Sequence, residues 1–260
     1  MPTPTTDPPP RDTAHADIGI VCALHLELGA FLERCEKVKK YTGGKFTFRG
    51  GRYDRARIAV VEAGTGFARS RDATHALVDA HTPPWILSVG FSGALRREMK
   101  VGDIVMAQAI VDTHGHELEI DLRMAADPER GLHVGKIVTA DNIVRTVAEK
   151  EALAERTGAL AVDLESLAVA QICRDRKVKF MAVRVISDDM SADLPPEVLS
   201  IFGATGSIRA GAVAGALWKR FSSAKDMWRL RQQAAQAAEK LATFLDGVVL
   251  QLAPPAADAR

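Results

Sequence analysis

The chain is poor in the features that would assign it to several functional classes. Aromatic residues make up only 5% of the sequence, and the formal net charge is +1 over 260 residues. Proteins that stack single-stranded bases need aromatic side chains, and proteins that bind nucleic acid or membrane surfaces through charge need a positive balance. No nucleic-acid partner is therefore expected. No apolar run reaches the roughly 20 residues that a spanning helix needs, so no membrane span is expected either.

Cysteine is also scarce. The three cysteines form neither a metal-ligand spacing nor an even disulfide set: Cys22, Cys35 and Cys173. This usage is typical of a reducing compartment, so we expect a cytoplasmic protein. His114, His116 and Glu117 are close enough to suggest a metal, but no further ligands follow at a fixed spacing. We expect a polar loop there, and neither a metal nor an organic cofactor.

The two ends of the chain differ in composition from the rest. Residues 1–16 are rich in Pro, Thr and Asp and lack the basic and apolar regions of a signal peptide. We expect a disordered tail over 1–16 and a frayed tail over 253–260. The segment 17–252 between them is predicted to form a single domain.

Between the tails, apolar β-branched runs alternate with segments that carry apolar residues at helical spacing. Strands are predicted at 18–23, 45–49, 57–62, 85–89, 104–111, 133–139, 160–162 and 180–186. Helices are predicted at 24–35, 67–81, 141–156, 164–173, 208–221 and 225–250. This alternation predicts an α/β fold, a three-layer α/β/α sandwich with a central mixed, mostly parallel sheet.

The segment 160–190 contains the densest group of chemically useful side chains. It is predicted as strand, helix and strand, with the two strands parallel and joined by a right-handed crossover. Ligands in such sheets bind at the carboxyl ends of the strands, which places Asp163, Glu165, Ser187 and Asp188 close together. Neighbouring carboxylates push each other's pKa values apart, and this is a basis for acid/base chemistry.

Two small-residue segments follow predicted strands. Gly64-Thr65-Gly66 precedes a helix, where backbone N–H groups can bind an anion, although a generic turn is the simpler interpretation. Gly90-Phe91-Ser92-Gly93-Ala94 is predicted as a loop whose glycines allow a ligand to approach the backbone. Glu27, in the first turn of the first helix, is either a charge that complements the helix dipole or a site residue.

Five motifs resemble, in order, those of the nucleoside phosphorylase and nucleosidase superfamily, and in particular of its 5′-methylthioadenosine/S-adenosylhomocysteine nucleosidases. They are 18–27 (IGIVCALHLE), 64–66 (GTG), 90–94 (GFSGA) with 101–105 (VGDIV), 162–165 (VDLE) and 184–188 (RVISD). The resemblance covers about residues 17 to 250. It implies a nucleoside phosphorylase-like fold, an N-ribosyl hydrolase or transferase, a small-molecule nucleoside as substrate, and a homodimer.

The resemblance also implies roles for individual residues. Asp188 matches the general acid that protonates the purine N7, and Glu165 matches the residue that bonds the ribose hydroxyls. Glu27 matches the residue that orients the attacking water. Arg184 matches a residue near that water, where its charge could hold Glu27 ionised. The further substrate-binding positions are Val162, Leu164, Ser187, Gly90, Phe91, Ser92 and Ile143.

Some positions depart from the nucleosidase pattern, and three functions stay open. Phe91 replaces a Ser, Ile143 replaces a Phe that stacks on the purine, and Leu164 replaces a Met. The segment 209–245 resembles the hopanoid-associated phosphorylases instead. We expect hydrolysis of a purine nucleoside modified at the 5′ position. The alternatives are phosphorolysis, with phosphate at the 64–66 turn, and a non-catalytic nucleoside-binding module.

Overall fold

The computed structural model of the protein describes residues 15–196 and 224–255. Four strands form the centre of its sheet: β1 (Ile18–Cys22), β4 (Ala56–Glu62), β5 (Trp85–Ala94) and β10 (Lys179–Asp188). β1 runs parallel to β4 and β5, and β5 runs parallel to β10. β2 (Glu36–Gly43) and β3 (Phe46–Tyr53) extend the edge beyond β4 as antiparallel strands. The predicted mixed sheet is confirmed, with parallel pairs at its centre.

Half of the sheet closes into a ring. β6 (Ile104–Asp112), β8 (Leu132–Thr139) and β9 (Ala161–Asp163) join β10 to β5 by a second route, because β10 pairs with both β5 and β6, and β9 with both β8 and β5. A short strand, β7 (Glu117–Glu119), lies on β6. The closure makes Gly93 a neighbour of Val162 on one side and of Asp188 on the other.

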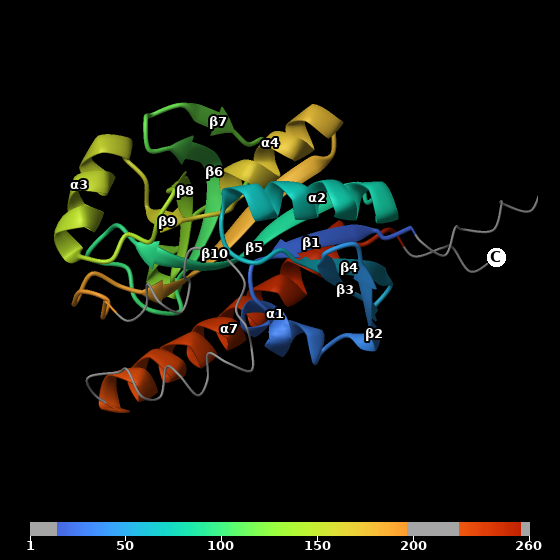
Figure 1. Cartoon of the computed structure of the whole chain (residues 1–260), viewed down its shortest axis with the longest axis horizontal. Helices are drawn as coiled ribbons and strands as arrows, with labels where there is room; N and C mark the ends of the chain where they lie inside the picture. Colours follow the sequence, from blue (N-terminus) through green and yellow to red (C-terminus); the bar gives the residue numbers. More distant parts are fainter. Residues whose placement is uncertain (1–14, 197–223, 256–260) are drawn as a thin grey trace, which may run out of the picture.

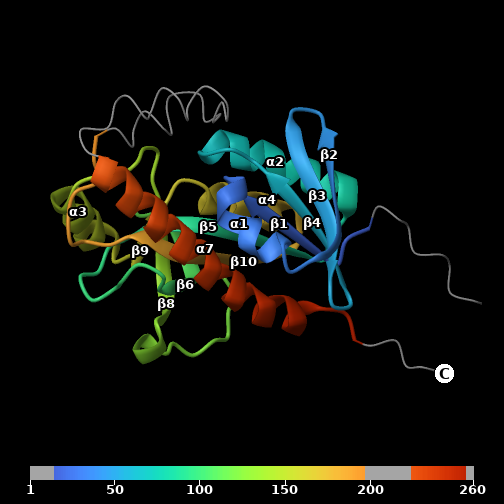
Figure 2. The same cartoon turned by 90° about the horizontal axis from the view of Figure 1, so that it is seen from below.

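Helices cover both faces of the sheet and give the predicted three layers. α1 (His25–Leu32) and the long α7 (Ala224–Leu252) lie on one face, and α2 (Phe67–His81) and α4 (Ser166–Arg176) lie on the other (Figure 1). α3 (Val147–Thr157) stands apart from these layers, at the end of the molecule that holds β8 and β9 (Figure 2).

The side chains of β1 show why the sheet is covered twice. All five of its residues are buried, and Ile18, Ile20 and Cys22 pack in the core under α1 and α7, whereas Val21 packs under α2 and α4. Alternation of side chains across the sheet requires this division. On α7 the buried residues recur at helical spacing: Ala237, Ala238, Leu241, Ala242, Leu245, Val248 and Val249. No helix in the described ranges combines the length and apolar character needed to cross a bilayer.

The segment 90–94 is strand and not the predicted loop. β5 continues to Ala94 because β10 pairs with it as far as Gly93 and β9 pairs with Gly93 and Ala94. These backbone partners outweigh the low strand propensity of the two glycines.

The predicted parallel crossover over 160–190 is wrong. β9 runs antiparallel to β5, whereas β10 runs parallel to β5, so α4 connects two strands of opposite direction. The apolar runs were located correctly, but an apolar run carries no information about the direction of its neighbours.

Several boundaries also differ from the prediction. The third helix begins at Val147 and not at 141, because Thr146 caps it in a reciprocal pair with Glu149. The strand β2 is not among the predicted strands, and β3 continues to Tyr53, beyond the predicted end at 49, so that the chain turns at 54–55. Ala16, predicted to lie in the tail, is buried and donates its N–H to the His81 carbonyl. The helix predicted at 208–221 lies outside the described residues.

Candidate active site

Glu27 is buried against the backbone of β5. Its Oε2 accepts a hydrogen bond from the Leu24 N–H at 2.8 Å, and its Oε1 accepts one from the Phe91 N–H at 3.0 Å. Gly90 makes this approach feasible, since a Cβ there would lie 2.8 Å from Oε1. Burial raises the pKa of Glu27 above its usual value, and the hydrogen bonds and the charge of Arg184 offset only part of that rise.

The side chain of Arg184 forms direct hydrogen bonds with Asp163 and Ser88. Its Nε donates to Asp163 Oδ2 at 2.8 Å and one terminal nitrogen donates to Ser88 Oγ at 2.9 Å. Both Arg184 and Asp163 are buried, and Asp163 also accepts from the Thr139 hydroxyl at 2.7 Å. Arg184 lowers the pKa of Glu27, which is the direction expected from the sequence. Burial raises that pKa by more, so the net shift is upward.

Glu165 lies two residues after the end of β9 and links that segment to the turn after β4. Its Oε1 accepts from the Gly66 N–H at 2.9 Å and its Oε2 accepts from the Leu164 N–H at 3.2 Å. Burial, followed by the charge of Asp163, raises the pKa of Glu165 to about 7, and Glu27 acts in the same direction. The carboxylates of Glu27, Asp163 and Glu165 therefore affect one another electrostatically. Arg184 lowers the pKa values of Glu27 and Glu165.

Two N–H groups of the 64–66 turn donate to protein acceptors. Gly66 donates to Glu165, and Gly64 donates to the Ala23 carbonyl at 3.0 Å. Arg69, on the following helix, donates from Nε to the carbonyl of the residue before the turn at 3.0 Å. Gly64 and Gly66 have φ values of 79° and 98°, which favour glycine. The turn thus positions Glu165 through the Gly66 N–H.

Asp188 ends β10 just after an irregularity in the β5–β10 pairing. Its Oδ1 lies 2.9 Å from the Ser187 hydroxyl, and its Oδ2 lies 2.5 Å from the Lys150 Nζ. A Cβ at Gly93 would lie 3.0 Å from Oδ2. Gly90 and Gly93 of β5 therefore leave room for Glu27 and Asp188 respectively.

Lys150, which the sequence motifs did not reveal, is the partner of Asp188 Oδ2. It lies on α3 with no exposed surface, and Nζ also donates to the Asp189 carbonyl at 3.0 Å. In sequence it sits between Glu149 and Glu151, a pattern that usually marks a solvated helix face. Its placement depends on how α3 docks against the end of β10, and no local motif encodes that docking.

The remaining predicted substrate positions lie around the same part of β5. Val162 is buried beside Gly93, and the Ser92 hydroxyl is buried and donates to the Val185 carbonyl at 3.3 Å. Phe91 packs against the core under α1 and α7. Two further positions, which stand on segments outside the strands, are half-buried: Ile143 and Leu164.

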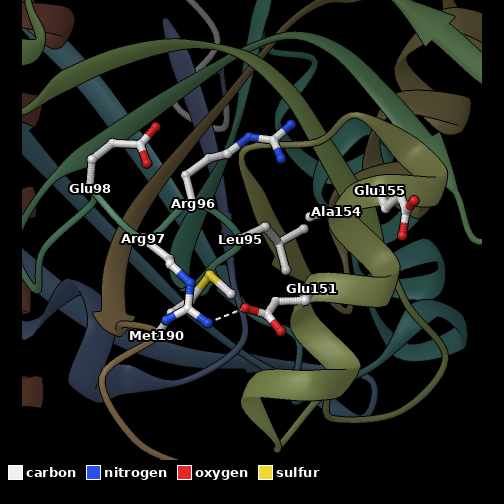
Figure 3. A pocket seen from close by; sticks show the side chains of 8 residues that line it. All are labelled: Leu95, Arg96, Arg97, Glu98, Glu151, Ala154, Glu155 and Met190. Carbon is white, nitrogen blue, oxygen red and sulfur yellow. Dashed lines mark hydrogen bonds and ion pairs between the residues drawn. The ribbon is translucent and has the colours of Figure 1, made fainter.

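Two features of the surface stand apart from these carboxylates. His116 bonds Asp112 at 2.8 Å, and no cluster of three or more metal-ligating side chains occurs in the described ranges. A surface pocket of about 340 Å³ lies between α3 and the segment after β5, where Arg97 pairs with Glu151 (Figure 3). None of the predicted site residues lines it.

Comparison with known proteins agrees with the fold and the motifs. A family model described as the phosphorylase superfamily matches residues 17–128 and 121–221. A 5′-methylthioadenosine/S-adenosylhomocysteine nucleosidase of Staphylococcus carnosus is 26% identical over an alignment 195 residues long, and the match covers 66% of this chain and 86% of the relative.

Two solved structures have the same fold. The Helicobacter pylori 5′-methylthioadenosine/S-adenosylhomocysteine nucleosidase, in complex with a pyrrolidinol that carries a 4-aminopyrrolopyrimidine, is 20% identical, with a TM-score of 0.66 over 90% of this chain and 97% of that one. Futalosine hydrolase of Helicobacter pylori is also 20% identical, with a TM-score of 0.64 over 90% and 97%. The family match, which spans most of the chain, identifies the protein as an enzyme of the phosphorylase superfamily.

Proposed function

We propose that the protein hydrolyses the N-glycosidic bond of a purine nucleoside that carries a substituent at the 5′ position. One observation carries this proposal: Glu27 and Asp188 contact β5 three residues apart, at Gly90 and Gly93. A base that activates water and an acid that protonates a leaving group must lie on opposite sides of one bond. The names of the nucleosidase relatives support the same reaction class.

Each carboxylate has a distinct task in this reaction. Bond cleavage leaves positive charge on the ribose and negative charge on the departing purine, so the site must stabilise both. Asp188 protonates the purine at N7, Glu165 bonds the ribose hydroxyls, and Glu27 takes a proton from the attacking water. The raised pKa of Glu27 suits a base that works near neutral pH, because a group whose pKa lies far below the working pH accepts a proton poorly.

Hydrolysis is favoured over phosphorolysis by the charge around Glu27. A phosphate in the place of the attacking water would face Glu27, Glu165 and Asp163. The nearby cation, Arg184, already bonds Asp163 and Ser88. Water carries no charge and needs only an acceptor for its proton, which Glu27 provides.

The test is release of free base from a panel of nucleosides with and without inorganic phosphate. The panel contains methylthioadenosine, adenosylhomocysteine, 5′-deoxyadenosine, adenosine, inosine and futalosine. We expect release without phosphate and faster turnover of the 5′-modified nucleosides. Release that depends on phosphate would establish phosphorolysis, and no release from any substrate would leave the binding module.

The acid is tested by Asp188→Asn, which keeps the size of the side chain but cannot supply the proton. The turnover rate is expected to fall roughly 10²–10⁴-fold, the usual contribution of a general acid. Asp189→Asn is the matched control, because within the described residues the Asp189 carboxylate bonds the exposed Ser191 N–H and no group of the proposed site. Near-wild-type turnover of Asp188→Asn would remove Asp188 from the acid role.

A further inference from the structure

Lys150 is an ammonium group buried beside the proposed acid. Its side chain has no exposed surface, and Nζ donates to Asp188 Oδ2 at 2.5 Å and to the Asp189 carbonyl at 3.0 Å. Burial of an ammonium costs several kcal/mol unless a partner compensates for it. The chain places this costly group on the carboxylate that, in the proposed reaction, must pass a proton to the leaving base.

The contact is fixed from three sides. The first turn of α3 is bonded to the segment after β10, where the Val147 N–H donates to Asp193 Oδ1 at 2.8 Å. Arg145 donates from its guanidinium to the Leu194 carbonyl at 2.6 Å. On the strand side, a Cβ at Gly93 would lie 3.4 Å from the Lys150 Cε and 3.0 Å from Asp188 Oδ2. The helix, the loop and the strand thus hold the ammonium and the carboxylate together.

We propose that Lys150 is a positioning residue that holds Asp188 Oδ2 in place and supplies the proton that Asp188 passes to the leaving base. This inference rests on the hydrolytic function proposed above. It adds Lys150 to the residues that assist departure of the leaving base. Lys150 lies on α3, whereas Glu27, Glu165 and Asp188 lie on other parts of the chain.

The proton balance of this step closes with the groups present. Before cleavage the pair consists of the Lys150 ammonium and the Asp188 carboxylate. As the bond from ribose to purine breaks, its electron pair moves into the purine, and N7 takes a proton through Asp188 while Lys150 gives one to Asp188. The pair ends as a neutral amine and a carboxylate. The proton that the attacking water gives to Glu27 passes to solvent, and solvent restores the ammonium.

The decisive experiment is a double-mutant cycle with Lys150→Met and Asp188→Asn, measured as kcat and KM for the fastest purine nucleoside of the panel. We expect Lys150→Met to lower kcat at least 100-fold with little change in KM. In the Asp188→Asn background the same change is expected to cost less than 3-fold, because the step that Lys150 serves is already lost. The double variant also removes both members of the buried pair, so that no unpaired charge remains to prevent folding.

Controls separate this role from a merely structural one. Glu151→Gln changes the next residue of α3, whose partner is the exposed Arg97, and is expected to leave kcat within 2-fold. Lys150→Arg keeps a cation beside Asp188 but cannot give up a proton, and is expected to recover less than 3-fold of the loss. A second substrate, 4-nitrophenyl riboside, has a leaving group that needs no proton, and its cleavage by Lys150→Met is expected to fall less than 5-fold.

The outcomes distinguish this inference from the proposed function. Absence of base release by the wild-type enzyme would count against hydrolysis itself. If the wild-type enzyme turns over but Lys150→Met costs the same factor in both backgrounds, or the same factor for both leaving groups, Lys150 supports only the fold and the inference is wrong.

Discussion

Replacement of Glu165 by Gln should change how the stability of the protein depends on pH. The variant should gain stability relative to the wild-type protein as the pH rises from 5 to 8. Burial and the charge of Asp163 raise the pKa of Glu165 from 4.5 to about 7. The folded protein therefore holds a proton on Glu165 at pH values where the unfolded chain has lost it. The wild-type protein loses this stabilisation as the pH rises through the interval, and a Gln cannot lose it.

The size of the effect follows from the two pKa values. One pH unit corresponds to about 1.4 kcal/mol, so the full interval corresponds to about 3 kcal/mol, most of which falls between pH 5 and pH 8. Gln retains an oxygen for the Gly66 N–H but turns its amide towards the Leu164 N–H, where Oε2 was the acceptor. That mismatch costs about 1–3 kcal/mol at every pH and leaves the pH dependence unchanged.

The assay is urea unfolding of both proteins at several pH values from 5 to 8. The difference in unfolding free energy should move towards the variant by about 2–3 kcal/mol across this range. Titration of all other groups contributes equally to both proteins and cancels in the difference. Parallel curves for the two proteins would refute the assignment of a raised pKa to Glu165, and with it the account of how these carboxylates interact.

Two further predictions concern the groups that hold Glu27 and Asp163. Gly90→Ala places a Cβ 2.8 Å from Glu27 Oε1 and should cost about 1–3 kcal/mol of stability and most of the turnover, whereas Gly50→Ala, whose Cβ would lie 3.7 Å from Tyr41, should retain its turnover in the same assay. Arg184→Met leaves the buried Asp163 carboxylate without its cation and should cost about 3–5 kcal/mol in urea unfolding. Loss of less than about 1 kcal/mol, the value expected for the exposed Arg97→Met, would contradict this role of the ion pair.

The elements with strong local signals could be predicted from the sequence. The helix at 67–81 has the observed bounds, because apolar residues recur at helical spacing and Pro83 and Pro84 follow its end. The first strand, 18–22, is equally clear as a continuous apolar run. In both segments the local pattern and the tertiary environment favour the same structure.

The pairing of strands could not be predicted in the same way. The glycines at 90 and 93 suggested a loop open to a ligand, but they lie in β5 and leave room for the carboxylates of Glu27 and Asp188. The direction of β9 likewise depends on β5 and β8, which are far from it in sequence. Contacts of this kind are set by packing of the whole sheet, and local propensity does not encode them.

The candidate site contains residues that lie in recognisable sequence motifs and one residue that does not. Glu27, Glu165 and Asp188 could be named from motifs, and the structure adds how each is held. Lys150 could not be named, because a lysine between two glutamates on a helix is typical of a solvent-facing surface. Its burial results from the docking of α3 on the segment that follows β10.

The central claim, that water attacks the ribose, is tested most directly by oxygen isotope labelling. The enzyme is incubated with methylthioadenosine in water enriched in oxygen-18, with inorganic phosphate present, and the sugar product is analysed by mass spectrometry. We predict a free sugar that carries one oxygen-18 atom, formed at the same rate when phosphate is omitted. A sugar 1-phosphate without the label, formed only when phosphate is present, would contradict the account.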